Sequence, residues 1–198
     1  QNLQVSQITP GGVITENAAE ATIQGLEMDV RWMPTASFSL MGGFAWTDAS
    51  YDRYCGNDPV REQGDPAPGC DTENPFDFSG ATLPASPEFA VSLLASYLID
   101  LNDWGRLTAS LQTSWTDEIN RRGLGNDEDV VEAYTNSSVR LGWENVSGQV
   151  KITAFVENLE DNSDLFFSAA PLFLGSDRPN QLTLVGNLPP RTSGVELE

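Results

Sequence analysis

The chain has 198 residues, a net charge of −19, a single lysine and no histidine. This acidic balance argues against a nucleic-acid partner, because phosphates recruit Lys and Arg, and the lack of histidine argues against a zinc site or a Ser-His-Asp triad. No run of about 20 apolar residues is present, so no membrane-spanning helix is predicted, which leaves alternating barrel strands as the way to cross a membrane.

Alternation of apolar and polar residues is the dominant pattern along the chain. In the first segment, GLEMDVRW, one side carries Leu26, Met28, Val30 and Trp32 and the other carries Glu27, Asp29 and Arg31. The period of two recurs in 37–46, 89–98, 107–115, 137–144 and 150–158, with Phe155 as an exception. Strands have this period, and no segment shows the 3.6-residue period of a helix. The sequence therefore predicts an all-β chain of about eight antiparallel strands.

Two cysteines, Cys55 and Cys70, enclose a loop of turn-forming and charged residues without core candidates. A disulfide here would stabilise the fold by roughly 3 kcal/mol, mainly by restricting the unfolded chain. It would also indicate an oxidising compartment such as the periplasm or the cell surface. Two unpaired thiols are the alternative.

Short and long connections alternate between the predicted strands. The short ones cover 33–36, 99–105 and 144–149, and the long polar ones cover 51–84, 117–130 and 158–190. Short turns at one end and long loops at the other indicate an up-and-down sheet, and outer-membrane barrels have this asymmetry.

Aromatic residues gather near both ends of these segments. Trp32, Trp104 and Trp143 lie near short connections, whereas Trp46 and Trp115 lie near long ones. Two aromatic belts suit a bilayer, where amphipathic rings settle at each interface. Large aromatic residues would equally fill the core of a soluble β-sandwich, and the period of two does not separate the two structures.

Four phrases in order resemble stretches of TonB-dependent outer-membrane receptors. They are NAAEATIQGLEMDVRWMPTASFSLMGGFAWTDASYD, FDFSGATLPASPEFAVSLLASY, AFVENLEDNSDLFF and PPRTSGVELE. The matching residues include Gly25, Glu27, Pro84, Pro87, Asn158, Leu159, Asp161, Pro190, Arg191 and Gly194. We interpret them as structural residues that set turns, strand ends and close approaches rather than as ligand contacts.

The resemblance implies part of an antiparallel, up-and-down transmembrane β-barrel with long extracellular loops, in the outer membrane of a Gram-negative bacterium. Lipid would contact Leu26, Met28, Val30, Trp32, Phe38, Leu40, Trp46, Trp115 and Trp143. The lumen would be lined by Glu27, Asp29, Arg31, Arg140, Lys151 and Glu157. The family barrel has about 22 strands around a plugged lumen. Residues 1–198 are therefore interpreted as the C-terminal portion of the barrel, with the plug domain and the N-terminal strands absent.

The implied function is uptake of a scarce nutrient, foremost a ferric siderophore, energised through TonB by way of the missing N-terminal region. No catalytic residue, metal site or cofactor is expected. The loop residues considered for ligand contact are Arg53, Arg61, Arg121, Arg122 and Arg178, because arginine suits anionic ligands. The alternative is a soluble or cell-surface β-sandwich or barrel that acts as a binding module and stays monodisperse without detergent.

Overall fold

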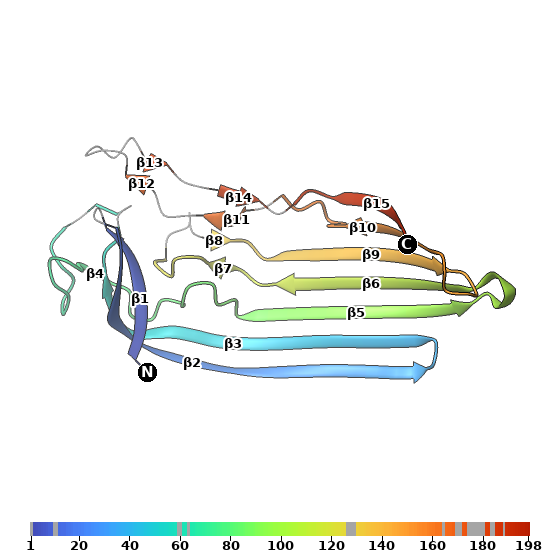
Figure 1. Ribbon diagram of the computed structural model, residues 1–198. Helices are drawn as coiled ribbons and strands as arrows, with labels where there is room; N and C mark the ends of the chain where they lie inside the picture. The colour runs from blue at the N-terminus through green and yellow to red at the C-terminus, as the bar shows by residue number, and fades with distance from the viewer. Residues whose placement is uncertain are drawn as a thin grey trace.

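A computed structural model describes residues 2–9, 12–58, 61–62, 64–125, 130–163, 165–168, 172–173, 181–182, 185–187 and 189–198. Eight antiparallel strands form one sheet in the order β1-β2-β3-β5-β6-β9-β10-β15 (Figure 1). Their bounds are β1 Asn2–Thr9, β2 Gly12–Thr35, β3 Phe38–Gly56, β5 Phe89–Asp100, β6 Arg106–Thr116, β9 Tyr134–Glu144, β10 Lys151–Glu157 and β15 Thr192–Leu197. Each strand pairs with the next along this path, which confirms the predicted up-and-down, all-β fold.

The connections lie at opposite ends of the sheet, short ones at one end and long ones at the other (Figure 1). Residues 36–37 join β2 to β3, a 3-10 turn η1 (Asn102–Trp104) lies between β5 and β6, and residues 145–150 join β9 to β10. The first long loop covers 57–88, the second 117–133 and the third 158–191. β3 continues through Gly56, beyond the predicted loop start at residue 51, because Arg53 and Tyr54 still pair with β2 and residues 55–56 pair with residues 76–77.

The long loops also contain short paired strands. They are β4 (Phe76–Asp77) on the end of β3, β7 (Ile119–Asn120) with β8 (Val130–Val131), β11 (Leu165–Ser168) with β14 (Val185–Asn187), and β12 (Leu172–Phe173) with β13 (Gln181–Leu182). Among the described residues no helix is long and apolar enough to cross a membrane.

Strand register divides the sheet into two faces. Leu26 pairs with Trp46, Trp46 with Phe89, and Val91 with Trp115, so these side chains share one side. We call this side the apolar face; it includes Leu26, Met28, Val30, Trp32, Phe38, Leu40, Trp46, Trp115 and Trp143. The polar face is the other side; it includes Glu27, Asp29, Arg31, Arg140, Lys151 and Glu157.

The buried core lies at the long-loop end, not across the sheet. The first long loop folds back along β3, where the Gly80 amide donates to the Tyr51 carbonyl (2.7 Å) and the Leu83 amide to the Ala49 carbonyl (3.0 Å). The cluster that this buries consists of Ala49, Tyr51, Tyr54, Phe78 and Leu83. In the described part of the chain no second sheet is stacked on the apolar face, as a sandwich would require.

Candidate functional site: the polar face and the long loops

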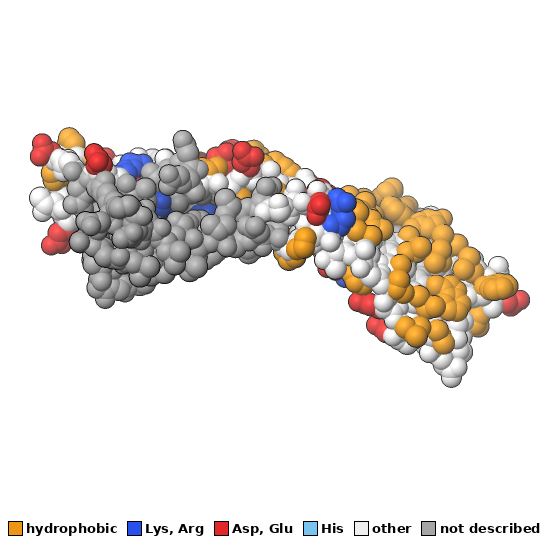
Figure 2. Space-filling model, turned by 90° about the horizontal axis from the view of Figure 1, so that it is seen from above, with side chains coloured by type: hydrophobic (Ala, Val, Ile, Leu, Met, Phe, Trp, Pro, Cys, Tyr) orange, Lys and Arg blue, Asp and Glu red, His pale blue; other side chains and the backbone are white. Residues whose placement is uncertain are grey.

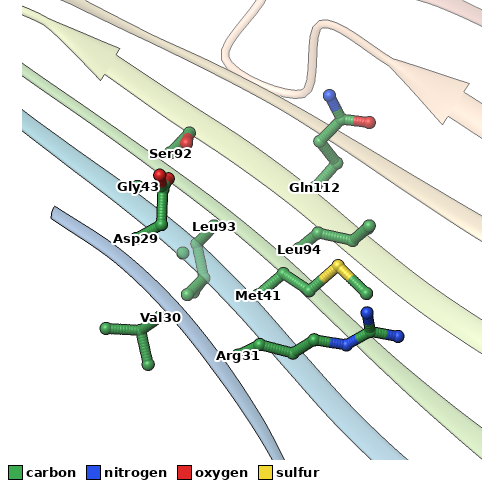
Figure 3. Close-up of a pocket in the computed structure, with 10 residues that line it drawn as sticks. Asp29, Val30, Arg31, Met41, Gly43, Ser92, Leu93, Leu94 and Gln112 are labelled. Carbon is green, nitrogen blue, oxygen red and sulfur yellow. The ribbon is translucent and has the colours of Figure 1, made fainter.

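A hollow of about 470 Å³ opens on the polar face where β2, β3 and β5 meet (Figure 3). Asp29 lies beside Gly43 and Ser92, and Arg31 lies beside Met41 (Figure 3). Gly43 leaves room between its neighbours, since a Cβ there would lie 2.9 Å from the Ser92 hydroxyl and 3.4 Å from an Asp29 carboxylate oxygen. A smaller hollow of about 290 Å³ adjoins it and includes Glu27. Glu27, Asp29 and Arg31, which are predicted to face the lumen, therefore line these two hollows.

Charges further along the polar face pair across neighbouring strands. Arg140 contacts Glu157 at 2.6 Å, Arg106 contacts Glu144 at 3.3 Å and Lys151 contacts Glu198 at 2.8 Å. All six side chains are at least one-third exposed, so each pair adds little to stability and mainly keeps this face charged and wet.

Phe155, the apolar exception to the alternation, lies on the polar face against its neighbours. The Arg140 guanidinium lies 5.3 Å from the centre of its ring, a cation–π arrangement. Gly194 is its partner on β15, and a Cβ at Gly194 would come within 2.8 Å of the ring. The family-like glycine therefore provides the space into which Phe155 fits.

Aromatic side chains mark both ends of the apolar face. Near the short turns, the rings of Trp32 and Phe38 are 6.0 Å apart, and the Trp143 indole N–H donates to the Trp104 carbonyl (2.8 Å). Near the long loops, the rings of Phe44 and Phe89 are 6.3 Å apart. Figure 2 shows hydrophobic side chains gathered over the half of the sheet that ends in the short turns.

The apolar face ends sharply toward the long loops. The next pair on the same face beyond Leu26 and Trp46 is Gln24 with Asp48, where the Gln24 amide nitrogen donates to the Asp48 carboxylate (2.9 Å). The next polar contact is from Thr22 to Asp52 (2.8 Å). The same side of β2 and β3 is thus apolar over one stretch and hydrophilic immediately outside it.

The cysteines form the predicted disulfide, with the two Cα atoms 5.6 Å apart. The enclosed loop contains Asp58, whose side chain is fully buried, although the sequence predicts no core residue there. Asp58 contacts Arg61 from its own loop and Arg122 from the second long loop. The sequence signal that could have indicated a buried Asp58 is the presence of Arg61 and Arg122, because a buried carboxylate requires cationic partners.

The loop arginines therefore differ in their surroundings. Arg61 and Arg122 contact Asp58, and Arg121, next to Arg122 in the sequence, is partly buried. Arg53 is exposed on β3 opposite Glu20. Arg178 lies outside the described residues. Groups of three or more His, Cys, Asp or Glu side chains placed to hold a metal ion are absent from the part of the chain that the structure describes.

The segment after β10 is bonded to the segment that leads into β15. Asn158 is buried and donates to the Asn162 carbonyl (2.9 Å) and the Pro189 carbonyl (2.8 Å). Asp161 accepts from the Arg191 amide (3.0 Å), and the Arg191 guanidinium donates to the Leu159 carbonyl (2.6 Å). Asn158 and Asp161 both have positive φ (53° and 58°), which Asn and Asp tolerate better than other residues.

Pro84 and Pro87 belong to the segment that leads into β5. A Cβ at Gly123 of the second long loop would lie 2.9 Å from Pro84, so the proline packs against that loop. Gly25 allows an equally close approach inside the sheet, since a Cβ there would collide with the Trp46 carbonyl oxygen. Pro84 and Gly25 thus both lie at points of close packing.

Comparison with known proteins adds the family. A family described as TonB-dependent receptor-like, β-barrel, matches residues 1–159. A search of curated proteins gave no match.

Two similar solved structures are the ferric yersiniabactin uptake receptor FyuA from Yersinia pestis and BauA, the ferric preacinetobactin receptor from Acinetobacter baumannii. FyuA is 16% identical with a TM-score of 0.67, covering 93% of this chain and 24% of FyuA. BauA is 20% identical with a TM-score of 0.61, covering 98% of this chain and 25% of BauA. The chain thus spans about a quarter of each, and at these identities the likeness shows the fold.

Proposed function

This chain belongs to the TonB-dependent receptor-like β-barrel family, and from that premise we propose that it forms part of the wall of an outer-membrane transporter. The transporter takes up a scarce nutrient, a ferric siderophore, and is energised through TonB. The observation that carries the proposal is the two-faced sheet, whose apolar face is bounded by aromatic rims and whose polar face is charged and hollowed.

The apolar face needs an apolar partner. Large hydrophobic side chains on it, such as Met28, Leu141 and Ile152, are between 39% and 55% exposed in the chain alone. Soluble proteins rarely expose contiguous apolar surface on this scale, because its hydration is costly. Between Phe38 and Trp46 the strand extends about 26 Å, and a tilt near 40° leaves roughly 20 Å across the membrane, close to the ≈ 25 Å lipid-facing band of such barrels. Lipid is therefore the proposed partner.

The polar face then lines the lumen. Its open hollows and its exposed ion pairs suit contact with water and with polar polypeptide rather than with hydrocarbon. We place residues 1–198 in the C-terminal portion of the barrel, because the family-like phrases occur in that order. The plug domain and the TonB-contacting segment belong outside these residues in this proposal.

The ligand class is supported by the two similar structures, since FyuA is a ferric yersiniabactin uptake receptor and BauA is a ferric preacinetobactin receptor. Within this chain the parts placed to meet a ligand are the long loops and the strand ends that carry them, with exposed Arg53, near the end of β3, as the clearest cationic candidate. We propose binding and transport, with no catalytic step by residues of this chain.

Uptake of radioactive iron tests the proposal. The full receptor is expressed in a Gram-negative strain without siderophore receptors of its own and offered a panel of ferric siderophores. Accumulation of iron from at least one of them, abolished by deleting tonB or by a protonophore, is the expected result. Surface binding without TonB-dependent accumulation across a broad panel would contradict a siderophore transporter.

A further inference from the structure

Asp58 sits at a contact between two long loops that are distant in sequence. Its carboxylate is fully buried and lies 3.3 Å from Nε of Arg61 and 3.7 Å from an Nη atom of Arg122. Arg61 belongs to the first long loop, whereas Arg122 comes from the second. We call Asp58, Arg61 and Arg122 the Asp58 cluster.

Arg61 extends the cluster in two directions. Its guanidinium lies 5.5 Å from the centre of the Phe78 ring and 5.8 Å from that of Phe76, both on the first long loop. The same guanidinium donates to the Leu124 carbonyl on the second long loop (2.7 Å). The Leu124 side chain also packs on the buried aromatic cluster that contains Phe78. One arginine thus connects the core of the first loop with the backbone of the second.

A second contact joins the same loops nearer the sheet. The Ala85 amide donates to the Asn120 carbonyl (2.9 Å), and Gly123 lies against Pro84 with no space for a side chain. Gly123 has a φ of 66°, and its amide is held by the Asn120 side chain (2.8 Å). The loops therefore touch at two separate places, the Asp58 cluster and this second contact, and two contacts hold their relative orientation better than one.

The disulfide encloses Asp58 in a short covalent loop. The Cys55–Cys70 bond closes the segment that carries both Asp58 and Arg61, with Cys55 next to the last residue of β3. Without the bond, only non-covalent contacts hold this segment against the strand, and the conformational freedom of the segment rises.

We propose that Asp58 is a positioning residue that fastens the first and second long loops into one rigid unit, and that the Cys55–Cys70 disulfide makes this fastening redox-dependent. Removing a buried carboxylate that lies between two arginines is strongly destabilising, because the buried cations lose the negative charge that balances them. The two loops therefore open together or not at all. The inference concerns the loops alone and holds whatever ligand the receptor carries.

Trypsin supplies a direct readout, since Arg61 and Arg122 are themselves cleavage sites. The full receptor is digested in outer membranes, and cleavage after each arginine is timed by mass spectrometry. In Asp58→Asn, cleavage after both residues should rise about tenfold or more, because proteolysis follows the population of the open form. Asp65→Asn, which neutralises an exposed acid in the same loop, should leave both rates unchanged.

Cross-loop effects distinguish positioning from local support. Arg122→Gln in the second loop should speed cleavage after Arg61 in the first, and Arg122→Lys should restore part of the protection. Heat-modifiable gel mobility confirms that each variant still has a folded barrel. Unchanged cleavage after Arg61 in folded Arg122→Gln, or unchanged cleavage after both arginines in folded Asp58→Asn, overturns the coupling.

The redox part has its own test. Reduction of the receptor, or the double variant Cys55→Ser and Cys70→Ser, should increase cleavage after Arg61 and Arg122 together. Protection that survives reduction while it is lost in Asp58→Asn overturns the redox dependence and supports the role of Asp58.

Discussion

Gly194 has no side chain, so the Phe155 ring of β10 can lie against the β15 backbone. Substituting Gly194→Val places methyl groups where the ring lies, within about 3 Å of its atoms. Overpacking of this kind costs about 1–3 kcal/mol. We expect the free energy of unfolding in urea, measured on the receptor in lipid vesicles by tryptophan fluorescence, to fall by that amount.

A second substitution identifies the cause. Phe155→Ala removes the ring, so adding Gly194→Val to it should cost little, and the two effects should be clearly non-additive. Additive costs would show that Gly194 matters for backbone freedom instead of for the ring.

Asn158 is the residue whose side chain holds the end of β10. Asn158→Ala removes hydrogen bonds to the Asn162 and Pro189 carbonyls and leaves these groups without that partner, at a cost of about 1–3 kcal/mol. Asn158→Gly loses the same bonds but accepts the positive φ, so it should be less destabilised than the alanine variant. Equal unfolding free energies for the two variants would exclude a contribution from backbone strain.

Residue-scale prediction from sequence succeeds where the chemistry is local. Asn158 and Asp161 are predicted as strand-ending residues that bond nearby backbone. Asn158 does accept from the Asn162 amide (3.1 Å), whereas Asp161 accepts from the distant Arg191 amide. Asp58 shows the limit. Its burial depends on Arg122, which lies in another loop, and no local pattern around Asp58 indicates which arginine will reach it.

At the scale of one strand, β5 offers two adjacent leucines on opposite faces. By strand register Leu93 lies on the apolar face midway between the Phe89 and Tyr97 positions, and Leu94 lies on the polar face; both leucines line the larger hollow. Leu93→Arg should cost about 2–4 kcal/mol, the value for arginine at the bilayer midplane, whereas Leu94→Arg enters the lumen and should cost much less. Unfolding in vesicles measures both.

The comparison is matched in residue type, strand and depth, so only the face differs. Equal costs would contradict the assignment of the apolar face to lipid. A larger cost at Leu94 would reverse the two faces.

Elements are predicted better than their contacts for a simple reason. Period-two alternation is local, so the segments around Leu93 and Val139 are recognised as strands, and the short turns set their antiparallel order. The long loops lack a period. Their sequence therefore did not predict that β3 continues to Gly56 or that Pro84 packs against Gly123.

For the whole molecule, the outermost strands of the sheet are β1 and β15, and each has one side without a strand partner among the described residues (Figure 1). Unpaired strand edges are templates for further pairing, and the receptor fold supplies neighbours for both. A polypeptide limited to residues 1–198 retains these edges. We expect it to associate through them in detergent, which light scattering after size-exclusion chromatography would detect as a mass well above one chain.

The register of β15 allows its outer edge to be blocked without disturbing its pairing with β10. Lys151 and Glu198 exchange both backbone hydrogen bonds (2.9 and 3.0 Å), so, with strand alternation, the Val195 amide points away from β10. Val195→Pro removes an edge donor and should lower the association of the 1–198 polypeptide, whereas Gly194→Pro breaks the ladder to β10 and should unfold the strand. If Val195→Pro associates as strongly as the parent, the β15 edge is not required, and assembly runs through the β1 edge or through the apolar face.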